Sequence, residues 1–529
     1  MFKLYYFKVI KHSYFKDLDL FFVNDDELDN DKVVTYEEYI KKDIPLSDDE
    51  RVIGPYKTLI IGPNGTGKSQ VLSVIIETFN ILSALKSNPS LKFPSSIRFI
   101  LKYFINNIEY HIDNREGVLQ IFVQNQPTPI QDIELPVKVI GSAINLNDRF
   151  PIVRETNKYF TDRYEYLGVR SAPNSAYISV HIKKIIDSLS NSANKLGKLP
   201  NIRLLFEKLD LSPVINLSFS PGRRFVLKAD NPNNIQNIIK SSKAFVGYFM
   251  SVITETRSKR LDERRLNKYE KLLNDPQTVD KAISFLQKVS NKFNQKYLYK
   301  IKLNYAIDFT KPETLQEFAA DAEILKTLRE LEIFSVNDID IRKQKTNFSA
   351  SKASSGEYHL LTSFLGIIAK IEDNSIILID EPEISLHPNW QMQYLNVLDK
   401  VFENYNNCHF IIASHSHFLV SDLKGFNSAI LTLFFDPATG LIKAKLLDND
   451  TYGWTPENIL YNIFNVASVS NHYFEMDLRN LVHLISENSD DYKRIKSYVD
   501  KFEFFERVPE DPLNIVINQA KGYLKEHGV

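Results

Sequence analysis

Short, almost wholly apolar runs occur in two parts of the chain that are some three hundred residues apart. The clearest are residues 58–61, 376–379 and 410–413, which are rich in Ile and Leu. An uninterrupted apolar run of this length is typical of a strand buried on both faces of a parallel sheet. After the first run, residues 70–82 place apolar side chains at helical intervals. A strand followed by an amphipathic helix is the pattern of an α/β fold.

Alternating patterns elsewhere predict antiparallel strands. Residues 2–23 indicate strands joined by a turn, and residues 97–122 indicate a hairpin whose turn is Asn106-Asn107. Residues 137–142 have the pattern of another buried strand. We therefore predict an α/β fold with a mixed sheet core and an antiparallel β subdomain.

The middle of the chain has helical character. Residues 262–273 are charged, with apolar side chains at helical spacing. Residues 314–331 place five apolar side chains on one stripe, namely Leu315, Phe318, Ala322, Leu325 and Leu328. The tail 455–529 also reads mainly as helices.

These patterns divide the chain into three predicted parts. Residues 1–180 form a first lobe, within which the acid-rich stretch 24–52 is expected to be an insertion loop. Residues 181–340 form a mainly helical insertion. Residues 341–529 form a second lobe that ends in a helical tail.

Composition excludes several classes of protein. The chain has 529 residues, which is too many for one ordinary hydrophobic core. Its formal net charge is −1, so the chain as a whole has no positive charge that would indicate a polyanionic partner. One cysteine, Cys408, excludes an internal disulfide and a cysteine-based metal cluster, and its apolar neighbours predict burial. Lysines interrupt the apolar N-terminus, so it is not a signal peptide, and no run is long enough to span a membrane. We expect a protein of the reducing cytoplasm.

A glycine-rich loop joins the run 58–61 to the helix that follows it. Its sequence is Gly62-Pro63-Asn64-Gly65-Thr66-Gly67-Lys68-Ser69, the GxxxxGK[ST] pattern of a P-loop. Backbone N–H groups of such a loop point at phosphate oxygens, and the helix N-terminus adds its dipole. Lys68 would reach the β- and γ-phosphates of ATP, and Ser69 would hold Mg²⁺. The predicted ATP-binding residues of this loop are Asn64, Gly65, Thr66, Gly67, Lys68, Ser69 and Gln70.

Two carboxylates follow the apolar run 376–379. Asp380 and Glu381 stand at the carboxyl end of a predicted parallel strand, which is where open α/β sheets bind ligands. This is a Walker B pattern. Asp380 would hold Mg²⁺, and Glu381 would polarise the attacking water as a general base.

A second candidate for phosphate binding precedes that strand. Ser354, Gly356 and Glu357 lead into an amphipathic helix, and a Ser hydroxyl beside free backbone N–H groups suits a phosphate. With the P-loop and the Walker B pattern, these residues resemble the ABC-type ATPases, in the branch that contains Rad50, the SMC proteins and RecF. The resemblance implies that Ser354, Gly356 and Glu357 contact ATP held by another copy, in a head-to-tail homodimer or a higher even-numbered oligomer. The alternative is a plain helix N-cap.

The resemblance also assigns two loops. His415, after the run 410–413, matches the switch histidine that contacts the γ-phosphate, although His417 lies two residues on. The resemblance therefore implies Lys68, Glu381 and His415 as catalytic residues. The loop 142–150 stands where a Q-loop is expected but has no Gln, so Asn145 or Asn147 would take that role.

Longer stretches of sequence indicate which branch of this family the chain resembles. The stretches 381–388 and 413–416 resemble bacterial ATPases of the OLD type, and 139–142, 147–151 and 166–170 resemble the ATPase subunit of Septu anti-phage systems, which also occurs beside some retrons. This implies a separate effector nuclease of the HNH type as partner. OLD nucleases carry a metal-dependent nuclease domain of the Toprim type. That domain needs a glutamate after one strand and an Asp-x-Asp motif after another. Asp448-Asn449-Asp450 follows no such strand, so we expect no nuclease in this chain.

Two other functions stay open at this stage. One is a RecF-like DNA-repair ATPase that acts directly on DNA. The other is an ATP-gated scaffold with negligible hydrolysis that holds a toxic partner inactive. Basic clusters would serve DNA or RNA, unless intrahelical pairing neutralises them. The clusters comprise Arg257, Lys259, Arg260, Arg264, Arg265 and Lys268, with Arg223-Arg224 and Lys183-Lys184 elsewhere.

Overall fold

The computed structural model describes two compact units, one within Met1–Gly453 and the other within Trp454–Val529. The described residues are 1–23, 54–145, 148–152, 159, 161–168, 186–188, 196–222, 235–255, 263–343, 355–421, 423, 427–447, 451, 454, 458–459, 472–503 and 513–528. The predicted acidic loop 24–52 lies outside them. Among the helices described, none has the length and apolar content that crossing a bilayer requires.

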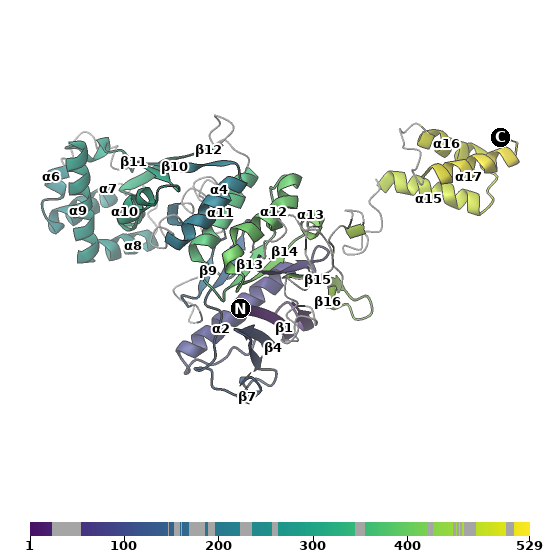
Figure 1. Ribbon diagram of the computed structural model, residues 1–529, viewed down its shortest axis with the longest axis horizontal. Coiled ribbons are helices and arrows are strands. Elements are labelled where there is room, and N and C mark those ends of the chain that lie inside the picture. Colours follow the sequence, from purple (N-terminus) through teal and green to yellow (C-terminus); the bar gives the residue numbers. More distant parts are fainter. Residues whose placement is uncertain are drawn as a thin grey trace. The chain divides into compact units, whose positions relative to one another are not determined.

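A seven-stranded sheet forms the centre of the first unit (Figure 1). Its order is β16 (Ile442–Leu447), β15 (Ser428–Phe435), β3 (Tyr56–Ile61), β14 (His409–Ala413), β13 (Ile376–Asp380), β8 (Val139–Ala143) and β9 (Tyr164–Tyr166). All neighbours are parallel except β16, which is antiparallel to β15 at one edge. Every residue of β3, β13 and β14 is buried, as the uninterrupted apolar runs predicted.

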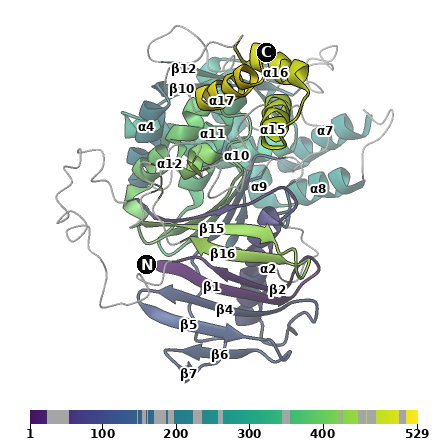
Figure 2. The same cartoon turned by 90° about the vertical axis from the view of Figure 1, so that its right-hand side faces the viewer.

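Helices cover both faces of this sheet. Helix α2 (Lys68–Ser87) packs on one face, and α11 (Ser355–Lys370) and α12 (Pro388–Val401) lie on the other (Figures 1 and 2). Two short elements, η6 (Glu403–Tyr405) and α13 (His417–Val420), flank β14 in the sequence. The sequence predicted α2 and α11 because both present apolar side chains at helical spacing.

A six-stranded antiparallel sheet covers the outer side of α2. Its order is β2 (Lys16–Phe21), β1 (Phe2–Lys11), β4 (Arg98–Ile105), β5 (Ile108–Asp113), β6 (Gln120–Val123) and β7 (Gln126–Pro127). The β4–β5 turn is the predicted Asn106-Asn107, and both residues have positive φ, which a two-residue hairpin turn of this kind requires. Aromatic rings of Phe2, Phe79 and Tyr103 join the sheet to α2. The predicted fold class, a mixed sheet core with an antiparallel β subdomain, is therefore confirmed.

The region predicted as a helical insertion also contains a sheet. Its described helices are η3 (Leu196–Lys198), α4 (Leu199–Lys208), α6 (Ile235–Ile238), α7 (Ser242–Glu255), α8 (Glu263–Leu273), α9 (Pro276–Phe293), η4 (Leu298–Lys300) and α10 (Pro312–Glu330). Strand β10 (Leu211–Pro221) pairs between β11 (Leu303–Asp308) and β12 (Phe334–Lys343). The prediction missed this sheet because the partners of β10 lie far along the chain, and local pattern does not reveal non-local pairing. The apolar stripe of α10 is buried as predicted.

The insertion is joined through η3 and α4 to the helices that cover the central sheet. Asn201 donates a hydrogen bond to the carbonyl of Val401 at 2.6 Å, and Lys198 donates one to the carbonyl of Ile371 at 2.9 Å. Both side chains are buried. These bonds satisfy carbonyl groups at the ends of α12 and α11, which have no partner within their own helix.

Within its described residues, the second unit contains the helices α15 (His472–Ser486), α16 (Tyr492–Glu503) and α17 (Leu513–Glu526). The helical tail was predicted, but as part of the second lobe. The structure separates it, because its apolar side chains pack with one another into a core of their own. That core comprises Leu481, Ile495, Val499, Phe502, Ile517, Ala520 and Leu524.

A buried histidine joins the seven-stranded sheet to the six-stranded sheet. His409 of β14 accepts a hydrogen bond at Nδ1 from the backbone N–H of Leu4 in β1, at 3.1 Å. Its Nε2 lies 2.8 Å from Thr58 Oγ1, and that hydroxyl donates to the carbonyl of Phe22. Nε2 therefore carries the proton and the ring is neutral. Burial, with a smaller effect of the Lys3 charge, lowers the pKa of His409 to about 3.

We expect acid to weaken the first unit through His409. The pKa of a histidine in an unfolded chain is about 6.5, so stability is complete above that pH and falls as pH decreases toward 3; at pH 5 the loss is about 2 kcal/mol. Thermal unfolding between pH 7.5 and pH 5 should show a lower Tm at the acid end. His409→Asn keeps an acceptor for Leu4 but does not titrate, so its Tm should change less with pH. Equal slopes in both proteins would contradict the assignment.

Candidate active site

Parallel strands in register bring three loops to one edge of the central sheet. Asp380 of β13 pairs with Ala413 of β14, and Ala413 pairs with Ile60 of β3. The chain segments after these strands therefore leave the sheet at the same end. The segment after β3 is the P-loop, the segment after β13 begins with Glu381, and the segment after β14 contains His415.

The P-loop has the backbone shape that its glycines permit. Gly65 and Gly67 have φ values of 85° and 83°, a region that other residues rarely adopt. A Cβ on Gly67 would also lie 2.9 Å from the ring of Phe15, so the loop fits only without a side chain there. Helix α2 begins at Lys68 directly after Gly67, and no side chain caps it. Its N-terminal N–H groups are thus oriented toward the loop, as phosphate binding requires.

Lys68 lies within the curve of this loop. Its Nζ donates to the carbonyls of Gly62 and Pro63 at 2.8 and 3.3 Å, and lies 3.4 Å from Nδ1 of His415. Burial lowers the pKa of Lys68 to about 8, and the carboxylates of Glu381, Glu383 and Asp380 oppose that change. A buried ammonium whose hydrogen-bond partners are neutral would gain from an anionic ligand.

Ser69 and Asp380 form the direct link between the P-loop and β13. The Ser69 hydroxyl donates to Asp380 Oδ1 at 2.9 Å, although the residues are 311 positions apart in the sequence. Asp380 is 2% exposed, and burial raises its pKa to about 7, against the lowering effect of the Ser69 hydrogen bond. The structure thus brings together the two predicted metal ligands.

Glu381 turns away from the strand that carries Asp380. Its φ is 48°, uncommon for a residue with a side chain, and its N–H donates to the carbonyl of Ala413 at 2.9 Å. The Glu381 carboxylate lies 3.4 Å from Asn145 Nδ2 and 3.8 Å from His415 Nε2. Of the two candidates for the Q-loop position, Asn145 therefore reaches the site, and Asn147 lies outside the described residues. Burial, with the Lys68 charge, lowers the pKa of His415.

Glu383 holds the backbone of His415 through a hydrogen bond. Its Oε1 accepts the backbone N–H of His415 at 2.6 Å. Burial raises the pKa of Glu383, and this hydrogen bond opposes the change. From the sequence, Glu383 was considered only as part of the stretch 381–388. Its contact with His415 was hidden because 32 positions separate the two residues.

A hollow of about 320 Å³ lies over the P-loop. Its lining comprises Tyr14, Phe15, Asn64, Gly65, Gly67, Lys68, Ser69, Gln70, Glu381, His415 and Ile442. The sequence missed Tyr14, Phe15 and Ile442. The signal in the sequence was the aromatic pair Tyr14-Phe15 in the turn between two predicted strands, and the structure leaves Tyr14 58% exposed. A second hollow of about 300 Å³ shares these three residues and continues toward Phe435.

Two of the residues predicted to contact ATP held by another copy, Gly356 and Glu357, are described, and neither lines this hollow. Gly356 opens α11, and a Cβ there would lie 2.2 Å from the carbonyl oxygen of Ser385, so the two backbones approach closely. Glu357 accepts a hydrogen bond from Lys343 at 2.6 Å. Ser354 lies outside the described residues.

We expect Glu383→Ala to reduce ATP turnover through His415. Losing the acceptor for the His415 N–H should lower kcat by about tenfold or more, with the Kd for ATP changed by less than about twofold. Glu383→Gln keeps an acceptor oxygen and should retain most of the activity. Phosphate release and equilibrium ATP binding measure both quantities. Equal losses in the two variants would assign the effect to the charge of Glu383 and refute the hydrogen-bond role.

Known proteins were compared with this chain by family, by sequence and by structure. The AAA ATPase domain family matches residues 32–420 of the chain. A search of curated proteins finds no match. The chain is similar to the SMC head domain from Thermotoga maritima, with 11% identity, 84% of this chain and 100% of that chain covered, and a TM-score of 0.31. It is also similar to the recombination mediator protein RecF, with 12% identity, 84% and 98% coverage, and a TM-score of 0.26. Since the family match spans well over half of its length, the chain belongs to the AAA ATPase domain family and is an ATPase.

Proposed function

We propose that this chain is the ATP-driven switch of an anti-phage defence system. Two copies would hold ATP between them, and the cycle of binding and hydrolysis would control a separate effector nuclease. The observation that carries the ATP chemistry is the gathering of Lys68, Ser69, Glu381 and His415 around one hollow, with Asp380 hydrogen-bonded to Ser69. The defence role and the HNH-type partner rest on the resemblance of the stretches 139–142, 147–151 and 166–170 to the ATPase subunit of Septu systems.

The residues of the hollow fit ATP with Mg²⁺. The P-loop amides and Lys68 would hold the phosphates. Ser69 Oγ and Asp380 Oδ1, 2.9 Å apart, are the hard oxygen donors that Mg²⁺ prefers, and Mg²⁺ takes few protein ligands beside the phosphates. Bound there, Mg²⁺ would neutralise charge on the β- and γ-phosphates. Tyr14 would offer its exposed ring to the base of the nucleotide.

Glu381 is the proposed general base. Its left-handed backbone directs it away from Asp380, and Asn145 and His415 lie beside its carboxylate. The carboxylate would accept a proton from water as that water attacks the γ-phosphate. Asn145 would hold the carboxylate in position, and His415 would donate a hydrogen bond toward the γ-phosphate from the side that Glu383 supports.

The position of Gly356 and Glu357 supports an assembly of two copies. Gly356 and Glu357 do not line the hollow that holds the P-loop, so within one chain they have no access to the phosphates held there. A second copy docked head to tail would supply its own Ser354, Gly356 and Glu357 to this ATP. Hydrolysis would then separate the copies, because the γ-phosphate that bridges them is lost.

We expect Glu381→Gln to abolish turnover and to trap the assembly. Without a base, phosphate release should fall by about 100-fold or more, while ATP binding persists. Light scattering should then detect a stable dimer with ATP and Mg²⁺, and a monomer without them. Asp373→Asn is the matched control, because this exposed carboxylate stands before β13, at the opposite end of the strand. Normal turnover in Glu381→Gln would refute the assignment.

Affinity purification from the native host tests the biological role. Tagged Glu381→Gln, kept in ATP and Mg²⁺, should retain a small nuclease at fixed stoichiometry. Lys68→Ala, which should bind ATP weakly, is the control and should lose this partner if the switch depends on ATP. Recovery of DNA without any protein partner would contradict the proposal and favour a DNA-repair ATPase. Very slow turnover by the wild-type protein, with a stably bound partner, would favour an ATP-gated scaffold.

A further inference from the structure

A basic stretch without any carboxylate runs from α9 into β11. Residues 281–307 contain no Asp or Glu, although the whole chain has a formal net charge of −1. Six lysines lie in this stretch: Lys281, Lys288, Lys292, Lys296, Lys300 and Lys302. This stretch differs from the basic clusters considered from the sequence. Those clusters involve positions 183–184, 223–224 and 257–268, where the arginine and lysine side chains lie outside the described part of the chain.

The six lysines fall into two groups. Lys281 and Lys288 have carboxylate partners on α10, Glu323 at 3.5 Å and Asp321 at 2.9 Å. Lys292, Lys296, Lys300 and Lys302 are exposed, and within the described residues none of these four forms an ion pair. We call these four residues the tip lysines. Their positive charge is not neutralised by the fold, so it is available to an anionic partner.

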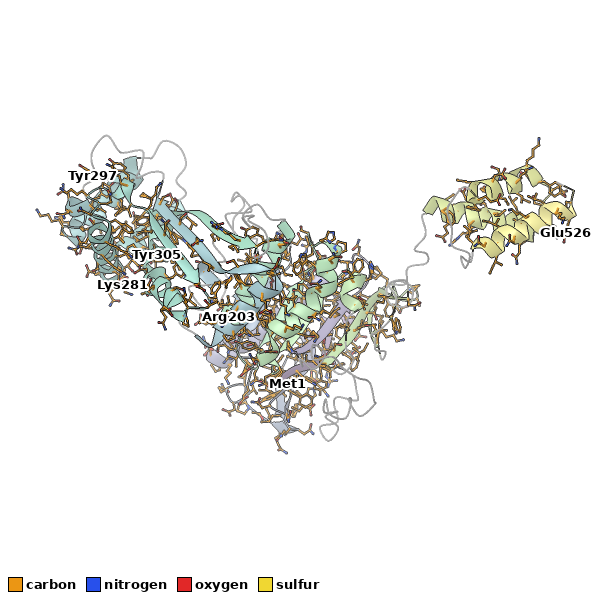
Figure 3. The ribbon with its side chains drawn as sticks, turned by 45° about the horizontal axis from the view of Figure 1, so that its top comes forward. Met1, Arg203, Lys281, Tyr297, Tyr305 and Glu526 are labelled. Atoms are coloured by element: carbon orange, nitrogen blue, oxygen red, sulfur yellow. The ribbon has the colours of Figure 1, made fainter. Side chains whose placement is uncertain are left out.

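Aromatic rings lie between the tip lysines. The rings of Tyr297 and Tyr299 are 5.7 Å apart, and Lys300 Nζ lies 5.4 and 5.7 Å from their centres. Phe293, 41% exposed, lies beside Lys292 at 5.9 Å. Figure 3 shows Tyr297 at the outer edge of the insertion. Rings interleaved with unpaired lysines are typical of grooves that bind single-stranded nucleic acid, because bases stack on the rings while ammonium groups contact phosphates.

The backbone that displays these side chains is held by hydrogen bonds. The N–H of Gln295 donates to the carbonyl of Ser290, and the Ser290 hydroxyl donates to the carbonyl of Gln295. The carbonyl of Lys296 accepts the N–H of Ile235. Leu298 and Ile301 are buried between the exposed positions. The surface is therefore preformed, which lowers the entropy that binding costs.

We propose that the tip lysines, with Tyr297, Tyr299 and Phe293, form a binding site for single-stranded nucleic acid. The lysines contact successive phosphates, and the rings accept bases without a sequence requirement. A membrane surface fits these residues less well, since Phe293 is the one large apolar side chain of α9, η4 and β11 that is substantially exposed. The site adds a nucleic-acid ligand to the ATPase and does not depend on the proposed effector nuclease.

Fluorescence anisotropy with a labelled oligothymidine of about 20 nucleotides tests the site. Lys296→Gln/Lys300→Gln should weaken binding by about tenfold or more and make the dependence of log K on log salt less steep by about 1.4, the value for two lost phosphate contacts. Lys281→Gln/Lys288→Gln removes the same charge from paired lysines and should change the affinity by less than about threefold. Tyr297→Leu/Tyr299→Leu should weaken binding by about fivefold or more with the salt slope unchanged.

Three results would overturn the site. They are no binding by the wild-type protein at about 0.1 M salt, equal losses in the two lysine pairs, and equal affinity for a duplex of the same length. ATP turnover without nucleic acid serves as the folding control, and all three variants should keep the wild-type rate. Because turnover is measured separately, failure of this site would be distinct from failure of the ATPase proposal.

Discussion

The in-register pairing of β3, β14 and β13 is the constraint on which the rest of the site depends. Ile60, Ala413 and Asp380 lie side by side across these strands. One residue of slip would move Asp380 by about 3.3 Å and turn its side chain to the opposite face of the sheet. The Ser69–Asp380 hydrogen bond and the approach of His415 to Lys68 both require the observed register.

The site places opposite charges where water does not stabilise them. Burial lowers the pKa of Lys68 and raises that of Asp380, so each group is less stable as an ion than it is in water. A triphosphate would provide the countercharge for Lys68, and a divalent cation would provide it for Asp380. We therefore regard the site as complete only with its ligands, and the unusual backbone of Glu381 as strain held by the surrounding fold.

Two parts of the chain have stable packing of their own and need not share the chemistry of the sheet edge. The insertion buries one face of a three-stranded sheet against α10, and α4 connects it to α11 and α12. The second unit, formed by residues 454–529, has a separate apolar core. Such additions can carry partners or ligands without disturbing the ATPase geometry, which is consistent with lysines and tyrosines gathering near α9.

The sequence by itself determined the local elements and the chemistry of the site. Uninterrupted apolar runs predicted β3, β13 and β14, and glycine spacing predicted the loop before α2, because burial and backbone freedom act over a few residues. Only the tertiary structure decided what lies together across hundreds of residues. The β10–β12 sheet, the support of His415 by Glu383, the position of Tyr14 over the P-loop and the separate C-terminal core all depend on packing between distant segments. Local patterns do not encode such packing, since many distant partners satisfy the same apolar or polar face.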